Sequence, residues 1–261
     1  MPHSGLSFDF DFEGAVVVVT GAGSGIGRAS ALLLAESNAK PVLVARHEDS
    51  LEEVAALIRD GGGESLTIPI DVSLPGAPAQ IVEQTTDAFG QLDGIVNNAA
   101  IVRHFPLAEW DMAGFDQHVA TNVRAPFFLI GAALPYLRRS PVAAVVNVGS
   151  SSGTLHRTGQ SVYGMTKAAL DYLTSSLAGE LAPDGIRINC VAPGPVDTPI
   201  HATWADDLDE AHRWLRSQVP LGRIGTPREL AEWIVLLLSP TSSFVTGAVI
   251  PVDGGQVIDR E

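Results

Sequence analysis

The chain is short of cysteine and of basic residues. Cys190 is the one cysteine among 261 residues, which excludes an internal disulfide and a cysteine-rich metal site. Lys and Arg number 16 against 30 Asp and Glu, so the formal net charge is −14. Binding to nucleic acid or to an anionic membrane surface needs a basic face. We therefore expect neither as a partner, and because the 7 histidines show no metal-ligand spacing we expect no metal site.

Long hydrophobic runs are also absent. The segment Trp233–Leu238 is far shorter than the roughly 20 residues of a membrane span, and Phe127–Leu137 is interrupted by Pro135. The first residues, Met1–Ser4, lack the basic and apolar regions of a signal peptide. Together with the single cysteine, these absences predict a globular protein in the cytoplasm.

The sequence does contain a regular alternation of two patterns. Apolar runs of strand length predict strands over residues 16–19, 42–45, 66–70, 94–97, 143–148, 187–191 and 248–252. Segments with helical periodicity predict helices over residues 25–37, 49–59, 78–89, 107–119, 122–139, 162–181, 205–217 and 227–238. We expect Asn38 to end the first helix in a left-handed conformation, and Asp49 or Ser50 to cap the second.

This order of elements indicates the fold class. Strands that are apolar on both faces belong to parallel sheets covered by helices. The sequence therefore predicts an α/β fold, a Rossmann-like, doubly wound, seven-stranded parallel sheet with helices on both faces. No linker or repeat divides the chain, so residues 1–261 are interpreted as a single domain, with 1–13 as an N-terminal tail and 253–261 as a C-terminal extension. Ligands of such sheets bind beyond the carboxyl ends of the strands.

A glycine-rich loop follows the first predicted strand. Its glycines fit G-x-x-x-G-x-G at Gly21, Gly25 and Gly27, although no start satisfies G-x-G-x-x-G. Glycines between a strand and a helix allow a pyrophosphate to approach the free N–H groups at the helix start. We expect a dinucleotide there; the alternative is a turn without a ligand. The expected contacts in the loop are Gly21, Ser24, Gly25, Ile26 and Gly27.

The end of the second predicted strand bears on the choice of cofactor. An acidic residue there would bind the ribose of NAD, but the chain has Arg46. Arginine binds a phosphate in a bidentate way, so NADP(H) is favoured. A solvated arginine is the alternative, and the nearby Glu48 and Asp49 keep NAD(H) open.

A tyrosine and a lysine are spaced for proton transfer. Tyr163 and Lys167 stand one turn apart near the start of a predicted helix, which places them on one face. An ammonium beside a phenol lowers its pKa from about 10, so the tyrosine can act as a general acid or base. Ser150 ends the fifth predicted strand and can donate to the same substrate oxygen. The alternative is an ordinary surface pair, since Y-x-x-x-K alone is weak evidence.

With these motifs in order, the chain resembles the short-chain dehydrogenase/reductase family, in its compact single-domain branch. The resemblance covers residues 12–256 or so. It rests on Thr20–Gly27, Asp71-Val72, Asn97–Ala100, Asn122, Ser150, Tyr163 with Lys167, Pro193-Gly194 and Asp253–Gly255.

The resemblance implies a role for each motif. Tyr163 would be the acid/base, Lys167 would lower its pKa and bind the nicotinamide ribose, and Ser150 would orient the substrate oxygen. Asn122 would hold a proton-relay water by deforming its helix. Beyond the glycine-rich loop, and besides Tyr163 and Lys167, the implied cofactor-binding residues are Arg46, Asp71, Val72, Asn98, Pro193, Gly194, Val196 and Thr198.

Two departures from the family pattern stand near the cofactor. Ala100 replaces a more usual glycine, and Ser24 occupies a position that is often basic in members that prefer NADP. The prediction of NADP(H) therefore rests on Arg46.

The substrate end should be enclosed by residues 101–105, 151–160 and 200–219, the last as a lid. The candidate substrate-binding residues are Ser152, His156, Arg157 and Trp204. A solvated loop is the alternative for His156 and Arg157, and packing against the lid's own helix is the alternative for Trp204.

The sequence thus predicts an oxidoreductase of secondary alcohols or ketones. A 3-oxoacyl-(acyl-carrier-protein) reductase and a non-catalytic dinucleotide sensor are the alternatives. The G-x-S-x-G at Gly149–Gly153 lacks the other parts of a hydrolase site. We also expect a homo-oligomer, a tetramer or a dimer, through Leu170–Leu181 and Leu230–Leu238, unless both segments face the sheet.

Overall fold

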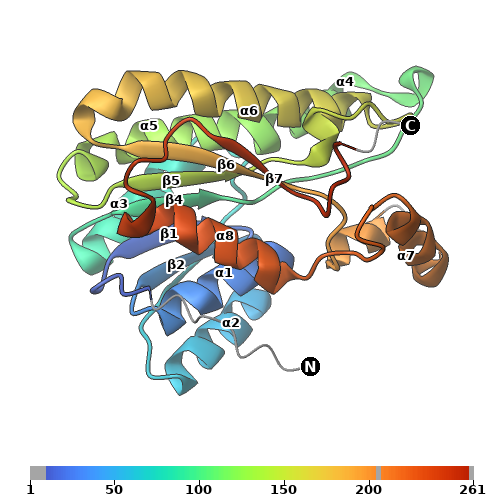
Figure 1. Cartoon of the computed structure of the whole chain (residues 1–261). Coiled ribbons are helices and arrows are strands. Elements are labelled where there is room, and N and C mark those ends of the chain that lie inside the picture. Colours follow the sequence, from blue (N-terminus) through green and yellow to red (C-terminus); the bar gives the residue numbers. More distant parts are fainter. Residues whose placement is uncertain (1–9, 204–206, 259–261) are drawn as a thin grey trace.

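The computed structural model describes residues 10–203 and 207–258, and within them seven parallel strands form one central sheet (Figure 1). In the sheet the strands follow the order β3-β2-β1-β4-β5-β6-β7. The predicted doubly wound α/β fold is therefore confirmed. The strands are β1 (Val16–Thr20), β2 (Lys40–Ala45), β3 (Leu66–Pro69), β4 (Gly94–Asn97), β5 (Ala144–Val148), β6 (Arg187–Pro193) and β7 (Val249–Val252).

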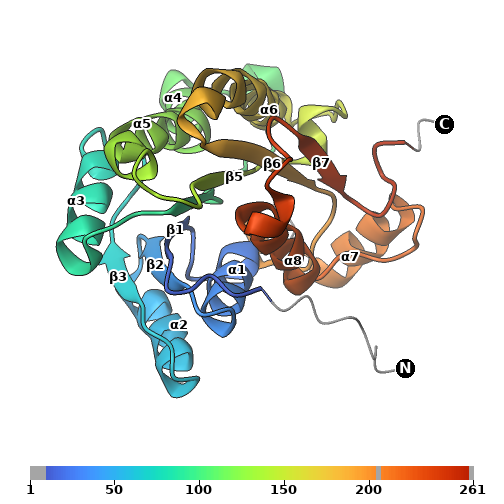
Figure 2. The ribbon, with the colours of Figure 1, turned by 60° about the vertical axis from the view of Figure 1, so that its left-hand side comes forward.

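Helices cover both faces of the sheet (Figure 2). One face carries α1 (Gly25–Glu36), α2 (Glu48–Asp60) and α8 (Pro227–Leu238). The other carries α3 (Ala77–Phe89), α4 (Met112–Val119), α5 (Ala125–Leu137) and α6 (Ser161–Leu181). A further helix, α7 (Leu208–Ser217), lies away from the sheet, beyond the carboxyl ends of the strands.

Two apolar cores result from the alternation of side chains along each strand. In β1, Val17 and Val19 join the core under α1, α2 and α8, whereas Val16 and Val18 join the core under α3, α5 and α6. All residues of β1, β4 and β5 are buried. This two-sided burial explains why the strands read as continuous apolar runs.

The sheet also determines where a ligand can bind. β1 pairs with β2 on one side and with β4 on the other, so the chain reverses its winding direction at β1. The loops after β1 and β4 then run to opposite faces, and they leave a crevice between them at the carboxyl edge.

Local signals explain where the helices differ from the prediction. The expected helix over 107–119 is divided into a short 3-10 turn, Leu107–Glu109, and α4, because Asp111 caps α4 by accepting from the Gly114 N–H at 2.7 Å. The predicted cap of α2 is wrong. α2 follows His47 without a side-chain cap, and the Ser50 hydroxyl donates to the His47 carbonyl instead.

The left-handed conformation predicted for Asn38 is confirmed by its φ of +60°. Of the expected N-terminal tail, residues 1–9 lie outside the described residues. Phe12 is buried in the core beside α1, and its N–H donates to the Ser37 carbonyl, so this end of the tail is part of the fold.

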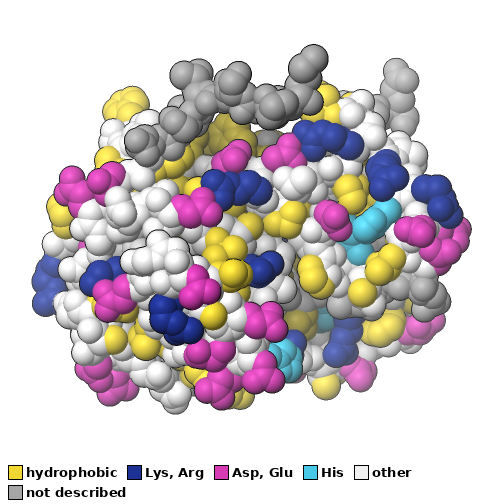
Figure 3. All heavy atoms as spheres, turned by 90° about the horizontal axis from the view of Figure 1, so that it is seen from below, with side chains coloured by type: hydrophobic (Ala, Val, Ile, Leu, Met, Phe, Trp, Pro, Cys, Tyr) yellow, Lys and Arg dark blue, Asp and Glu magenta, His cyan; other side chains and the backbone are white. Residues whose placement is uncertain are grey.

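Charged side chains of both signs are distributed over the surface (Figure 3). On the face shown in Figure 3, Asp and Glu side chains are interspersed with Lys and Arg over the described surface. In the described part of the chain, none of the helices has both the length and the apolar character needed to cross a membrane.

Candidate active site

The glycine-rich loop after β1 forms a close-fitting cradle. Gly21 has a φ of +70°, which L side chains rarely adopt, and a Cβ there would lie 2.6 Å from the amide nitrogen of Asn98. A Cβ on Gly27 would collide with the Gly21 carbonyl oxygen, and one on Gly25 would lie 3.1 Å from the methyl group of Thr198. Gly21 and Gly27 therefore stand where another part of the chain leaves no room for a side chain, and Gly25 stands where a Cβ would be tightly packed.

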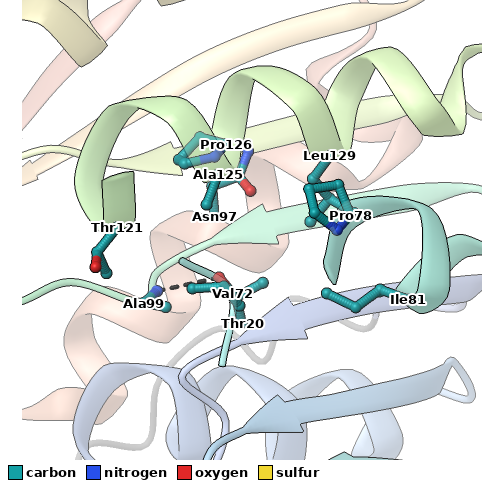
Figure 4. A pocket seen from close by; sticks show the side chains of 10 residues that line it. All are labelled: Thr20, Val72, Pro78, Ile81, Asn97, Ala99, Thr121, Ala125, Pro126 and Leu129. Atoms are coloured by element: carbon teal, nitrogen blue, oxygen red, sulfur yellow. Dashed lines mark hydrogen bonds between the residues drawn. The ribbon is translucent and has the colours of Figure 1, made fainter. Parts of the chain in front are cut away.

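Hydrogen bonds to Thr20, the last residue of β1, tie the start of this loop to the segment that follows β4. The Asn98 amide donates to the Thr20 carbonyl at 2.9 Å, and the N–H groups of Asn98 and Ala99 donate to the Thr20 hydroxyl oxygen at 3.0 Å. A cavity of about 10 Å³ lies beside these bonds, between the sheet and α5 (Figure 4). Because it has room for about one water molecule, it is not the cofactor site.

A much larger cleft, of about 490 Å³, opens at the carboxyl edge of the sheet. This volume is typical of sites for small organic ligands. No side chain caps the first turn of α1, so its N–H groups are free to meet an anion beside the loop. The predicted cofactor residues that line the cleft are Gly21, Ser24, Gly25, Ile26, Arg46, Asp71, Val72, Asn98 and Thr198.

Other predicted cofactor residues do not line this cleft. Val196 is buried and forms a β-bridge with Gly225, and a Cβ on Gly194 would lie 2.7 Å from the Cα of Asp253. These residues, with Pro193, shape the chain that carries Thr198. Gly27 acts in the same indirect way, through the close approach of α1 to the loop.

The end of β2 presents a basic edge to the cleft. Arg46 is exposed and lines the cleft together with His47 and Ser50. Glu48 and Asp49 belong to the exposed first turn of α2 and are not among the lining residues. The arginine rather than the acids therefore borders the region in which a ribose would lie.

Ser150, Tyr163 and Lys167 come together at the carboxyl end of β5. Ser150 lies two residues beyond the end of the strand, and its hydroxyl oxygen accepts from the Ser152 N–H at 3.1 Å. α6 places Tyr163 and Lys167 one turn apart. The Lys167 ammonium donates to the Val148 carbonyl at 2.7 Å and lies 5.7 Å from the centre of the Tyr163 ring.

The pKa values of this pair are set mainly by burial. Burial lowers the pKa of Lys167 to about 8, against opposing Coulombic interactions with Cys190 and Asp171. Burial raises the pKa of Tyr163, while a hydrogen bond with Ser150 acts in the opposite direction. The lowered tyrosine pKa expected from the sequence is therefore not present. Desolvation of the phenol is the dominant effect, and the ammonium lies against the ring face and a backbone carbonyl.

Two residues near this pair were missed in the sequence. The Cys190 thiol donates to the Asp171 carboxylate at 3.3 Å, and burial raises the pKa of both groups. Asp171 stands one helical turn after Lys167, so the same spacing rule identifies it. A thiol with a raised pKa stays protonated, so Cys190 is not a nucleophile.

Asn122 lies in a π-helical turn, Ala120–Arg124, that joins α4 to α5. Its side-chain oxygen accepts from the Ile101 N–H at 3.0 Å, and its amide donates to the Ile101 carbonyl and to the Thr166 hydroxyl. The helix deformation implied by the resemblance is therefore present. Ile101 lines the cleft and Thr166 belongs to α6, so Asn122 joins the cofactor cleft to the tyrosine-bearing helix.

A chain of hydrogen bonds continues from Ser150 to the expected substrate side. The Ser152 hydroxyl donates to Gln160 at 2.8 Å, and the Gln160 amide nitrogen lies 2.9 Å from His104 Nε2. His104 and Gln160 were not among the predicted site residues, because a lone histidine or glutamine in a loop carries no motif. Ser152 therefore links Ser150 to Gln160 in this series of hydrogen bonds.

The other predicted substrate residues have different environments. His156 is exposed, whereas Arg157 is half-buried with its guanidinium 5.8 Å from the centre of the Trp214 ring in α7. Trp204 lies outside the described residues.

At the far end of the site, the Ser151 hydroxyl donates to Gln256 at 2.8 Å, and the Leu221 N–H donates to the Gly254 carbonyl. Gly254 and Gln256, near the C-terminus, thus contact both the segment after β5 and the segment after α7.

The described residues contain no group of His, Cys, Asp and Glu that could hold a metal ion. The site therefore consists of a cleft of about 490 Å³ and a Ser-Tyr-Lys group that Asn122 connects to it.

Comparison with known proteins agrees with this geometry. A family model described as Enoyl-(Acyl carrier protein) reductase matches residues 21–256. The chain is 37% identical over 230 residues to cis-4-hydroxycyclohexanecarboxylate dehydrogenase of Sinomonas cyclohexanicum, covering 88% of this chain and 91% of the relative. It is 34% identical over 233 residues to a 3-oxoacyl-(acyl-carrier-protein) reductase of Thermotoga maritima, covering 89% and 93%.

A solved structure gives the same result. The crystal structure of a short-chain type dehydrogenase/reductase from Mycobacterium marinum superposes with a TM-score of 0.88 at 35% identity, covering 95% of this chain and 97% of the other. The relatives and the superposed structure therefore point to the same family as the site itself. The features of the site that indicate this family are the glycine-rich loop, the cleft at β1 and the Ser-Tyr-Lys group. The protein belongs to the short-chain dehydrogenase/reductase family of nicotinamide-dependent oxidoreductases.

Proposed function

We propose that the protein transfers a hydride between a nicotinamide cofactor and a secondary alcohol or ketone, with Tyr163 as the general acid/base. The observation that carries the proposal is the convergence of Ser150, Tyr163 and Lys167 at the end of β5. Asn122 connects this group to the cofactor cleft through its hydrogen bonds to Ile101 and Thr166.

The cleft fits a dinucleotide because its glycines stand where a Cβ would collide with the chain, and because α1 starts beside it without a side-chain cap. Gly21, Gly25 and Ile26 would lie along the pyrophosphate, Asp71 and Val72 at the adenine, and Thr198 toward the nicotinamide. The bound cofactor accepts or supplies the hydride at its nicotinamide ring.

The protein's own side chains handle the proton. In oxidation, the Tyr163 phenolate takes the proton from the substrate hydroxyl as the carbinol carbon loses its hydride, and a carbonyl forms. In reduction, the Tyr163 hydroxyl gives its proton to the carbonyl oxygen. Ser150 donates a hydrogen bond to the same oxygen, and in this proposal the Lys167 ammonium stabilises the phenolate against the burial that raises the Tyr163 pKa. The side chain of Asn122 is bonded to Ile101 and Thr166, so its part in this proposal is to hold a proton-relay water through its π-helical turn.

The preferred cofactor in this proposal is NADP(H). Arg46 borders the cleft at the end of β2 and is suited to a 2′-phosphate, while Glu48 and Asp49 are not lining residues. The flanking His47 and Ser50 add polar groups at the same edge. NAD(H) is the alternative that a direct comparison of the two cofactors tests.

For the substrate, the proposal favours a small alcohol or ketone. The relative that acts on cis-4-hydroxycyclohexanecarboxylate supports a cyclic alcohol. A 3-oxoacyl-(acyl-carrier-protein) substrate has the support of the Thermotoga relative, but a net charge of −14 repels an acidic carrier protein at long range. A non-catalytic sensor has no need of Tyr163 and Lys167, and both are present.

We further propose that the protein forms a homo-oligomer. In the two segments predicted for contact, Leu170, Leu230 and Ile234 are buried inside the subunit. Tyr172 and Trp233 of the same segments are nevertheless exposed, as are Phe127, Phe128 and Met165 outside them. These exposed apolar side chains support an interface between copies. Light scattering that gives a mass near the 27.4 kDa of one chain would refute this assembly.

The decisive test of the function is a screen of cyclic alcohols, ketones, hydroxy acids and oxoacyl thioesters with NADPH, NADH and their oxidised forms. With a substrate in hand, Tyr163→Phe should lower kcat by at least about a hundredfold, as expected for loss of a general acid/base. Binding of NADPH, followed by fluorescence, should be retained. Normal turnover in Tyr163→Phe would refute the proposed mechanism.

A further inference from the structure

Arg157 differs in the bonds that it makes from Arg187, the other half-buried arginine among the described residues. Burial lowers the pKa of both Arg157 and Arg187. The Arg187 guanidinium donates to the carbonyls of Leu237 and Leu238 and to the hydroxyl of Ser242, among other oxygens. Arg157, by contrast, has no ion pair and no guanidinium hydrogen bond to any residue that the structure describes. The positive charge and the N–H donors of Arg157 are therefore available to bind another group.

The position of Arg157 is fixed by its surroundings. Its carbonyl accepts from the Gln160 N–H at 3.1 Å, which closes the loop between Ser150 and Tyr163. Its guanidinium lies over the ring of Trp214 in α7. It is also close enough to His104 to oppose protonation of that imidazole. These contacts hold the arginine between the serine loop and α7.

The same loop leads back to the reacting group. His104 is linked through Gln160 and Ser152 to Ser150, by three hydrogen bonds that include the Ser152 N–H to the Ser150 hydroxyl. Arg157 thus belongs to the loop that carries this chain of hydrogen bonds, and it is not among the residues that line the cofactor cleft between Thr198 and Arg46.

We propose that Arg157 binds a carboxylate of the substrate, so that the preferred substrate is a hydroxy acid or the corresponding oxo acid. The inference rests on the proposed function and names its substrate class. A planar guanidinium matches a carboxylate with two parallel hydrogen bonds, and the bond is stronger where water is partly excluded. In a chain with a net charge of −14, an unpaired, half-buried arginine creates a local positive site for an anion.

The Trp214 ring has a defined part in this proposal. A guanidinium over an aromatic face keeps its N–H donors at its edge, in the plane in which a carboxylate binds. Trp214 is thus a positioning residue, which acts through Arg157 rather than on the substrate.

The test compares matched substrates with and without the charge. The pairs are 4-hydroxycyclohexanecarboxylate and its methyl ester, and 3-hydroxybutyrate and its methyl ester, each assayed with the preferred oxidised cofactor. We expect at least one carboxylate to have a higher kcat/KM than its ester. Arg157→Gln should raise the KM for that carboxylate about tenfold or more, as for loss of a charge-assisted hydrogen bond, and leave the KM for the ester unchanged.

Arg216→Gln is the matched control. Arg216 is an exposed arginine on the same helix as Trp214, so its loss removes one positive charge nearby without touching the proposed contact. It should leave both KM values unchanged. Arg157→Lys should restore part of the carboxylate preference, since it keeps the charge and loses the fork. Trp214→Leu should raise the KM for the carboxylate with little change in kcat.

The possible outcomes distinguish failure of the carboxylate site from failure of the proposed function. If the wild-type protein oxidises the esters or neutral alcohols while both carboxylates bind no better, the carboxylate site is wrong and the oxidoreductase function stands. If Arg157→Gln lowers turnover of esters and carboxylates equally, the arginine is structural and the inference fails. If no alcohol or ketone is turned over with either cofactor, the proposed function itself is wrong.

Discussion

The ammonium of Lys167 lies 5.7 Å from the centre of the Tyr163 ring while donating to the carbonyl of Val148. The lysine is only 3% exposed, and it is bound to the last residue of β5 rather than to the phenol. The strand thus holds the charge in place beside the tyrosine. A lysine held in this way keeps its orientation whichever protonation state the tyrosine has.

The burial of Lys167 should be visible in the pH dependence of stability. Its pKa falls from 10.5 to about 8 in the folded protein. Between these values the unfolded chain binds more protons, so this lysine's contribution makes the folded state more stable as pH rises. Relative to Lys167→Met, the wild-type free energy of unfolding should increase by about 3 kcal/mol from pH 7 to pH 10.

Urea unfolding of the two proteins at several pH values measures this difference. Tyr163 is common to both, and its raised pKa destabilises the folded state only above the phenol's ordinary pKa of about 10, so the comparison stops at pH 10. If the difference in the free energy of unfolding between the two proteins stays constant from pH 7 to pH 10, burial does not disfavour the charged form of Lys167.

Replacement of Arg46 should separate the two cofactors. Arg46→Ala should weaken NADPH binding about tenfold or more and change NADH binding little, because only NADPH carries the 2′-phosphate. Fluorescence titration gives both constants. Arg59→Ala, at the exposed end of α2, removes a charge outside the cleft and should affect neither. Equal weakening of both cofactors by Arg46→Ala would remove the basis for preferring NADP(H).

The glycine cradle can be tested with a matched pair of alanine variants. In Gly27→Ala the new Cβ would meet the Gly21 carbonyl and the Asn98 amide, so cofactor binding should be lost and stability should fall by about 1–3 kcal/mol. Gly131→Ala, inside α5, has open space around its Cβ and should stabilise the helix by up to about 1 kcal/mol. If Gly27→Ala binds the cofactor as tightly as the wild-type protein, the close approach of Gly27 to the Gly21 carbonyl is not required for binding.

The link from the cleft to α6 through Asn122 can be measured by a double-mutant cycle. The Asn122 amide donates to the Thr166 hydroxyl at 3.1 Å, and both side chains are buried. Asn122→Ala and Thr166→Val should each destabilise the protein, and the double variant should lose about 0.5–1.5 kcal/mol less than the sum. Strict additivity would mean that this bond contributes nothing to stability.

The same variants report on catalysis. Asn122→Ala should lower kcat more than it changes KM for the alcohol, because the π-helical turn serves the proton path rather than substrate binding. A change in KM alone would place Asn122 in the substrate site instead.

Most of the fold followed from local patterns in the sequence. The strand runs ending at Thr20 and Val148 were apolar on both faces because each is covered by helices on both sides. The glycine spacing selected Gly21, Gly25 and Gly27, and in the structure a Cβ at each would lie within 3.1 Å of another part of the chain. Helix ends were less predictable. Asp111 begins α4 by a side-chain cap, whereas His47 precedes α2 without one.

The site was predictable only where a residue belongs to a spacing motif. Tyr163 and Lys167 share a helix face, but the polarity around them depends on contacts between distant segments. Cys190 meets Asp171 across 19 residues, and His104 meets Gln160 across 56. The direction of the tyrosine pKa was missed for the same reason, because desolvation by the folded chain cannot be inferred from an i, i+4 spacing.

The strand order has a consequence for how the protein assembles during synthesis. β1 receives its second neighbour only when Asp93, 77 residues farther along, reaches the N–H of Val16. Thr198, against which Gly25 is fitted, comes later still. Contacts so distant along the chain form slowly. A nascent chain that ends before β6 therefore has the glycine loop but no complete cofactor cleft, so the cofactor can stabilise the protein only after most of it has left the ribosome.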